Sequence, residues 1–434
     1  MQNKTNLVQD PVAEDDEGED LEEDPLQRIS SVAVVLSLPL IGVLITMVSA
    51  TIYSIESSMS LAASLTASIS LVTLTLRYCD FQLQIGTTYA SFMYLTYLLV
   101  NTNGLVQFFI IYEFFLLPSA ALVWYFSPNK RGVKTTMFFL LWTQLGSILV
   151  LTASSYAVEI LNTVEFYTEN LNNGLPIPYQ ICLIIGFLIK VPIFPFYFWL
   201  TKTHVEAVTS FSIFLSGFLV KIAIFGMFKY SIFLNKEILT VAAAASLVSA
   251  INTSILFAYQ VDLKKVIAYA TIQEMSQLAL CSSIFWVKKA GLIAVFLITH
   301  TILSAKYFLL NDIVYRIYNT RSILAIQGLG ISSPKLTIII VSTLTLFRGL
   351  PFTIKNIVEV TLMSLLVSIS GAIAAMWAIF VVFLGNILFS YVFLKTTNFS
   401  PQKELVFLDI NKQDGSTVLL LVLLLLFLQQ TNTI

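Results

Sequence analysis

Long apolar runs recur along the whole chain, and they restrict its fold more than any other feature. A helix needs about 20 apolar residues to cross the hydrocarbon core of a bilayer. Charged residues make up 11% of the chain, against about 25% in soluble domains. The runs lie at 31–53, 58–76, 86–102, 105–126, 133–157, 180–200, 207–231, 238–260, 263–285, 290–315, 336–367, 369–394 and 416–430. We therefore predict an all-α polytopic membrane protein with about 13 transmembrane helices.

Two of these runs contain helix-breaking residues near the middle. Pro192 and Pro195 lie within 180–200, and Pro351 lies within 336–367, a run that is too long for one straight helix. Proline removes a backbone donor and clashes with the preceding turn. We expect both helices to be broken, and a broken helix inside a membrane frees carbonyls that can hydrate a site.

Charge is distributed unevenly between the beginning of the chain and the rest. Residues 1–30 hold ten of the 25 acidic residues and two of the 24 basic residues. Such a segment is typical of a solvated, poorly ordered tail, and a docking arm on a neighbouring subunit is the alternative. It lacks the features of a signal peptide and is too acidic for a transit peptide.

Basic residues in the connections orient the spans. Twelve lysines and arginines fall in the connections around 127–134, 201–206, 261–265, 316–335 and 395–415, and four fall in the alternate connections. Because cytoplasmic connections carry an excess of Lys and Arg, the first set is expected to face the cytoplasm-equivalent compartment. For an inner mitochondrial protein this compartment is the matrix.

The small numbers of cysteines and histidines exclude several classes of site. Three separated cysteines provide no CxxC motif or disulfide framework. Two histidines are too few for a bis-His dihaem cytochrome or a haem-copper oxidase core. The sequence Gly328-Leu329-Gly330 lacks the context of a nucleotide-binding loop. We expect no cofactor and no metal in this chain, and no contact with nucleic acid.

Charged residues inside the apolar runs are the main functional signal. Each would cost about 2.5–3.5 kcal/mol or more at the centre of a lipid-facing helix, so each must face protein or water. Burial disfavours the charged form of both carboxylates and ammonium groups, so both can exchange protons near neutral pH. These residues are Glu113, Lys190, Lys221, Glu274, Lys306, Arg348, Lys355 and Glu359.

Helix breaks and small residues mark the best candidates among these charges. Lys190 precedes Pro192 by two residues, and Glu359 follows Pro351 by eight. Lys355 lies four residues before Glu359 and is placed to pair with it. Lys221 lies among small residues, which let helices and water approach.

Other polar residues have a functional and a structural interpretation. Lys306, Arg348 and Lys355 are candidates for snorkelling or structural pairing as much as for function. His300, in the middle of a run, is either a relay member or a satisfied packing residue. His204 and Glu206 lie at a turn between spans, where a structural role competes with a relay role. Glu274 could also be a boundary acid.

Several of these residues lie in sequence motifs that resemble those of one family. The motifs are YEFFLLP (112–118), FLIKVP (187–192), WLTKTHVEA (199–207), FLVK (218–221), DLKKVIAY (262–269), LPFTI (350–354) leading to Glu359, and LDINK (408–412). Across about 105–430 they resemble the antiporter-like, proton-translocating subunits of mitochondrial NADH:ubiquinone oxidoreductase (respiratory complex I). The form HVEA is characteristic of the subunit-4 branch.

The resemblance implies an architecture and a mechanism. It implies an inverted-repeat membrane domain at 105–430, preceded by divergent transmembrane helices at 31–104. The family usually has 14 spans, and one fewer would place the acidic tail in the matrix. It also implies that Glu113 and Lys190 form an interacting pair, that Lys221 leads to a central hydrophilic axis, and that Glu359 lies on the exit side.

The resemblance further implies the surroundings of the chain. Proton translocation would be driven by NADH-to-ubiquinone electron transfer in partner subunits, which would hold the flavin and iron–sulfur clusters. The expected partners are the other membrane-arm subunits, including antiporter-like subunits 2 and 5, and membrane lipids, in the mitochondrial inner membrane. The alternatives are a stand-alone cation/proton antiporter and a pump-inactive structural paralogue.

Departures from the family pattern concentrate in the middle of the relay. The sequence has Thr201 and Val208 where the family has prolines, and Tyr197 and Glu274 where it has histidines, while Lys306 and Arg348 occupy normally apolar positions. We therefore expect a rewired middle, with Glu274 or Lys306 substituting for histidine and Glu274 leading toward Lys221 or Lys306.

Overall fold

The computed structural model describes residues 83–126, 130–161, 175–285, 290–326, 328–347 and 353–370. In these ranges the chain is built from helices, which confirms the all-α prediction for this part. The acidic tail, Arg348, Pro351 and residues 371–434 lie outside the described ranges, as do most of 31–104. The helices are α3 (Leu83–Val100), α4 (Leu105–Phe114), α5 (Leu116–Phe126), α6 (Lys130–Leu161), α7 (Ile177–Lys190), α8 (Phe198–Glu206), α9 (Thr209–Phe214), η1 (Leu215–Leu219), α10 (Val220–Tyr230), η2 (Ser231–Phe233), α11 (Lys236–Ala258), α12 (Leu263–Phe285), α13 (Ala290–Tyr318), α14 (Leu329–Ser332), α15 (Pro334–Phe347) and α16 (Ile354–Ser370).

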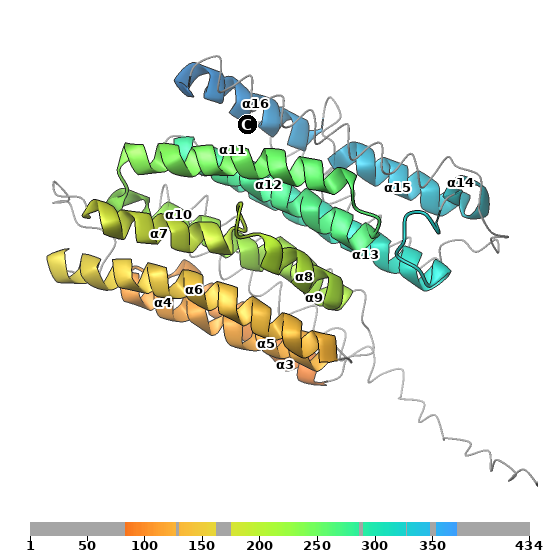
Figure 1. Cartoon of the computed structure of the whole chain (residues 1–434), viewed down its shortest axis with the longest axis horizontal. Helices are drawn as coiled ribbons and strands as arrows, with labels where there is room; N and C mark the ends of the chain where they lie inside the picture. The colour runs from red at the N-terminus through yellow and green to blue at the C-terminus, as the bar shows by residue number, and fades with distance from the viewer. Residues whose placement is uncertain are drawn as a thin grey trace, which may run out of the picture.

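The helices lie alongside one another in chain order across a bundle. Figure 1 shows α3 to α6 along one edge, α7 to α10 next, then α11 to α13, with α15 and α16 at the opposite edge. Contacts join α6 to α7, α11 to α12, α12 to α13 and α13 to α16. Five helical stretches in the described part are long and apolar enough to cross a membrane. They are Leu105–Tyr125, Arg131–Ile160, Thr209–Phe233, Lys236–Ala258 and Gly291–Tyr318.

Two of these five stretches are enclosed by the rest of the chain. For Thr209–Phe233 and Gly291–Tyr318, 89% of the most apolar part is buried, against 39–44% for the other three. The enclosed helices carry Lys221, His300 and Lys306. Placing a charge on an enclosed helix avoids the cost of exposing it to lipid.

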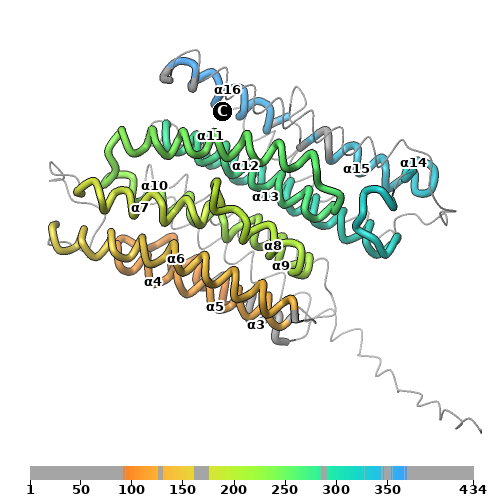
Figure 2. The backbone as a smooth tube through the Cα atoms, viewed as in Figure 1, coloured from red at the N-terminus to blue at the C-terminus, as the bar shows by residue number. Residues whose placement is uncertain are grey.

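The predicted break in the run 180–200 is present. The α-helix α7 ends at Lys190 and α8 begins at Phe198, with buried Pro192 between them. Figure 2 shows the backbone leaving the axis of α7 at this point and returning to continue as α8. The break leaves the Ile189 carbonyl free, and it accepts a hydrogen bond of 2.9 Å from the Trp199 indole.

A second irregularity, which the sequence analysis did not predict, lies in the next span. One turn of π-helix, η1, separates α9 from α10. A π-helical turn is rare and is found frequently at functional sites. It ends two residues before Lys221. It contains Ser216 and Gly217, which belong to the small residues around Lys221 noted in the sequence.

The close contact between α6 and α7 depends on two glycines. A methyl group on Gly186 would lie 2.7 Å from the Gly146 carbonyl oxygen, and one on Gly146 would lie 2.9 Å from that of Gly186. These separations are shorter than any real Cβ contact, so the two backbones pack directly against each other. This glycine contact is one helical turn from Lys190, so it fixes the position of Lys190 along the axis of α6.

Three of the connections that carry the excess of Lys and Arg, 201–206, 261–265 and 316–335, meet at one end of the described bundle. An antiparallel bridge joins Asp262 to Ser322, and the Arg321 side chain donates a 3.1 Å hydrogen bond to the Val205 carbonyl. Figure 1 shows the end of α8, the α11–α12 connection and the end of α13 on the same side. This agrees with the grouping made from basic residues, while the assignment of that end to the matrix stays a prediction.

Candidate functional site

Glu113 and Lys190 form an ion pair between α4 and α7. The Lys190 Nζ lies 2.9 Å from Oε1 of Glu113. It also lies 3.7 Å from the centre of the Tyr112 ring, a cation–π contact. The second carboxylate oxygen of Glu113 accepts a 3.2 Å hydrogen bond from Gln144. The side chains are 20% and 7% exposed, so Glu113 reaches toward the surface while Lys190 is enclosed.

A small cavity lies beside Lys190 on the side that faces the π-helical turn. Its volume of about 40 Å³ is enough for about two or three water molecules, since one needs about 10–15 Å³ on this measure. It reaches from the ion pair to the segment that precedes Lys221. The lining residues are Tyr112, Phe115, Leu116, Phe139, Thr143, Lys190, Trp199, Leu215 and Leu219.

Lys221 is buried with three uncharged acceptors around its ammonium group. Its Nζ lies 3.0 Å from the carbonyl oxygens of Ser216 and Gly217 and 2.8 Å from Oγ1 of Thr301. An ammonium group has three donors, so all three are satisfied. The π-helical turn supplies two of the acceptors and α13 supplies the third, so the backbone irregularity is part of the lysine site.

His300 is next to Thr301 on α13, the residue that accepts a hydrogen bond from Lys221. It is fully enclosed, and neither ring nitrogen has a hydrogen-bond partner among the described residues. It is close enough to both Lys221 and Lys355 for electrostatic interaction. An imidazole can accept a proton at one nitrogen and donate from the other. Its position is therefore suited to proton transfer between the two lysine sites.

Three charged groups meet beyond His300, on α12 and α16. Lys355 forms an ion pair and hydrogen bond with Oε1 of Glu274, and its Nζ lies 3.4 Å from Oε1 of Glu359. All three residues are buried. The spacing of four residues had indicated the contact between Lys355 and Glu359. The contact between Glu274 and Lys355 joins residues 81 positions apart and was not predicted from the sequence, which predicted a link from Glu274 toward Lys221 or Lys306.

The remaining candidates, Lys306, His204 and Glu206, make no described contact with the charged residues above. Lys306 is fully buried on α13, and its Nζ has no hydrogen-bond partner in the described part of the chain. His204 is buried in α8 and stacks on Phe308 with ring centres 4.9 Å apart. Glu206 is the last residue of α8, at the predicted turn.

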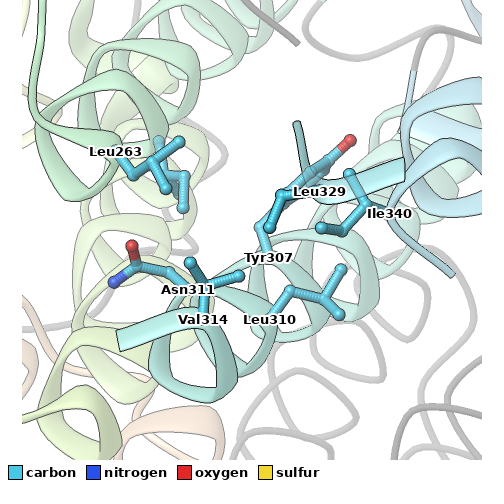
Figure 3. Close-up of a pocket in the computed structure, with 8 residues that line it drawn as sticks. Leu263, Tyr307, Leu310, Asn311, Val314, Leu329 and Ile340 are labelled. Atoms are coloured by element: carbon cyan, nitrogen blue, oxygen red, sulfur yellow. The ribbon is translucent and has the colours of Figure 1, made fainter. Parts of the chain in front are cut away.

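A second small cavity lies between α12, α13, α14 and α15. Its volume is about 20 Å³, room for one water molecule. Figure 3 shows Asn311 at its edge among apolar side chains that include Leu263 and Val314. The Asn311 carbonyl oxygen is buried without a hydrogen-bond partner among the described residues, so a water molecule here would satisfy it. Apart from Tyr307 the other lining residues are apolar, and none of the charged residues described above lines the cavity.

Comparisons with known proteins place these residues in a family context. The sequence profile described as "NADH:quinone oxidoreductase/Mrp antiporter, TM" matches residues 102–389. NADH-ubiquinone oxidoreductase chain 4 of Paramecium tetraurelia is 33% identical over 374 residues, which cover 84% of this chain and 78% of that protein. Chain 4 of Rhipicephalus sanguineus is 28% identical over 249 residues, which cover 56% of each protein.

Solved structures share the fold at low sequence identity. A chain of the archaeal membrane-bound sulfane sulfur reductase superposes with a TM-score of 0.78 at 13% identity, covering 93% of this chain and 95% of that one. A chain of respiratory complex I from Thermus thermophilus gives 0.72 at 21% identity, covering 86% and 80%. A chain of the Mrp complex from Dietzia sp. gives 0.72 at 15% identity, covering 91% and 78%.

Proposed function

The chain belongs to the NADH:quinone oxidoreductase/Mrp antiporter transmembrane family, and from this premise we propose that it is a proton-translocating membrane-arm subunit of respiratory complex I. In this proposal NADH-to-ubiquinone electron transfer takes place in other subunits, which hold the flavin and iron–sulfur clusters. The relatives named chain 4 support this assignment. The chain itself would contribute proton transfer.

The ion pair between Glu113 and Lys190 is the observation that carries the proposal. A 2.9 Å pair that is only partly exposed, at the end of a broken helix and beside a cavity with room for water, supports a site that gains and loses protons. A carboxylate and an ammonium group in contact stabilise each other's charged forms. Moving them apart makes a proton transfer favourable, so a conformational change elsewhere in the complex can drive the step.

The route proposed runs from this pair through the middle of the chain. Protons pass through the cavity beside Lys190 to Lys221, then across His300 to the group formed by Glu274 and Glu359. The supports for this order are the cavity that joins Lys190 to the π-helical turn, the contact of Lys221 with Thr301 next to His300, and the electrostatic interaction of His300 with both lysines. Lys306 is a lower-ranking member, because it is buried on α13 but makes no described contact with the others.

The partners and the location follow from the same proposal. The chain would lie in the mitochondrial inner membrane against other membrane-arm subunits, including the antiporter-like subunits 2 and 5. The exposed apolar side chains on α6, such as Met137, Leu141 and Ile148, would face those subunits or lipid. His204 and Glu206 would stabilise the turn after α8.

The driving force separates this proposal from a cation/proton antiporter, which the family also includes. Sealed vesicles that contain the assembled complex are supplied either with NADH or with an outward gradient of Na⁺ or K⁺, and internal acidification is measured. We expect acidification with NADH and not with the cation gradient. Acidification by the cation gradient alone would favour the antiporter. NADH-driven pumping that is unaffected by Lys190→Met would favour a pump-inactive structural subunit.

A further inference from the structure

Lys355 is the centre of a buried group of charges that the proposed route reaches but does not use. It lies on α16 between two carboxylates, Glu274 on α12 and Glu359 one turn further along its own helix. The exposed fractions of Lys355, Glu274 and Glu359 are 3%, 6% and 8%. One lysine therefore serves two carboxylates in a place that bulk water does not reach.

The two oxygens of Glu274 have different surroundings. Oε1 accepts the hydrogen bond from Lys355, whereas Oε2 is buried and has no hydrogen-bond partner among the described residues. A buried oxygen without a donor is unfavourable. A water molecule would supply the missing hydrogen bond, and a proton would remove the negative charge that burial disfavours. Oε2 is therefore the atom of this group that is ready to receive a proton.

The charges of the neighbouring groups make such a transfer neutral overall. Lys221 interacts electrostatically with Glu274, and with both lysines charged and both carboxylates ionised the four groups sum to zero. When a proton leaves Nζ of Lys221 and binds Oε2 of Glu274, the sum is still zero. Among the described residues, His300 is close enough to both lysines for electrostatic interaction, and Cys281 is close enough to Glu359.

Lys355 can then follow the negative charge without giving up its own proton. Once Glu274 is protonated, the remaining carboxylate is Glu359, 3.4 Å from the same ammonium group. When the proton passes on to Glu359, the ammonium returns to Glu274. Both carboxylates already lie within contact distance of the Lys355 ammonium group, so the ammonium has to move only a short way from one to the other. The lysine therefore stays paired at every stage, and no isolated buried charge is left.

We propose that Lys355 is a positioning residue, a permanently charged counter-ion that Glu274 and Glu359 share while a proton passes from one carboxylate to the other. The inference rests on the proposed function, because it assumes that protons arrive from Lys221. It adds a residue and a division of roles: the carboxylates carry the proton and the lysine does not.

The test compares variants of the assembled complex in sealed vesicles. Lys355→Arg keeps a permanent charge and should pump within about twofold of the wild type. Lys355→Met leaves both carboxylates without a counter-ion and should lower pumping about tenfold or more, because an opposite charge in contact changes the proton affinity of a carboxylate by at least that factor. Lys335→Met, at an exposed lysine on α15, is the matched control.

Infrared difference spectroscopy during NADH turnover supplies a readout that a purely structural role would not change. We expect a C=O band of a protonated carboxylic acid in the wild type and in Lys355→Arg, and its loss in Glu274→Gln, which preserves size and the contact with Lys355. If Lys355→Met does not assemble, the carboxylic acid band and the pumping rate are compared between Lys355→Arg and Glu274→Gln, and this comparison still tests the proposal.

Three results would overturn the inference. They are wild-type pumping in Lys355→Met, the absence of any carboxylic acid band sensitive to Glu274→Gln, and a Lys355→Arg variant that assembles and shows the band but does not pump. Lys190→Met is measured in parallel. If that variant pumps normally, the proposed function fails, whereas a defect in Lys190→Met with none in Lys355→Met removes only the shared counter-ion.

Discussion

Replacing Lys190 with Met tests the ion pair that begins the proposed route. The side chain is 7% exposed, and Met has a similar length and volume, so packing should change little. The substitution removes the 2.9 Å contact with Glu113 and the cation–π contact with Tyr112. Glu113 keeps its hydrogen bond to Gln144 but loses its counter-charge, so its partly buried carboxylate has no opposite charge left beside it.

The size of the effect follows from the geometry of the pair. Removing one partner of a buried ion pair costs about 3–5 kcal/mol. Because Glu113 is 20% exposed, solvent screens part of this cost, and about half of it, roughly 1.5–2.5 kcal/mol, applies. Since about 1.36 kcal/mol corresponds to a tenfold change in rate, pumping should fall by about ten- to a hundredfold.

The assay is NADH-driven proton pumping by assembled variant complexes in sealed vesicles. Coupled NADH oxidation should fall together with pumping, while the amount of assembled complex stays close to that of the wild type. Lys190→Arg should recover little, since a guanidinium group is effectively never deprotonated. Lys202→Met, at an exposed lysine of α8, should behave as the wild type.

Normal pumping by Lys190→Met would refute the reasoning, because it would show that the buried charge is not needed for transfer. Full recovery in Lys190→Arg would also contradict it, since the lysine would then serve as a fixed charge. The expected contrast with Lys355→Arg, which should pump, makes the two lysines an internal comparison.

Three further predictions concern packing, the Lys221 site and topology. Gly186→Ala would place a methyl carbon 2.7 Å from a backbone oxygen of α6, which should destabilise the assembled complex by about 1–3 kcal/mol. Gly291→Ala is the control, because Gly291 has open space around it and this substitution should not destabilise the complex. Thermal unfolding of the two variant complexes measures the difference. Thr301→Val removes an acceptor 2.8 Å from the buried ammonium group of α10 and should slow pumping about tenfold, while Thr301→Ser should restore it. An amine reagent that does not cross membranes should label exposed Lys265 from the matrix side and exposed Lys236, at the other end of α11, from the opposite side.

The local features of the site were predictable from the sequence. The break after Lys190 follows from Pro192, because a missing backbone donor interrupts a helix wherever it occurs. The contact between Lys355 and Glu359 follows from their spacing of four residues on one helix. The burial of Lys190 and Lys221 follows from the cost of a charge inside an apolar run. The partnership of Glu113 with Lys190 came from the family resemblance, and the structure has the two groups in contact.

Other features depend on which helices lie side by side, and only the tertiary structure decided them. The π-helical turn before Lys221 contains no proline, and Ser216 and Gly217 within it are compatible with an ordinary α-helix as well. Thr301 completes the site from α13. The contact of Glu274 with Lys355 joins α12 to α16, and sequence spacing carries no information about such a distant pair. The sequence determined that these charges had to be enclosed, since lipid cannot solvate them. The packing of the helices determined which charge neutralises which, because a buried ion is stabilised only by the groups within a few ångströms of it.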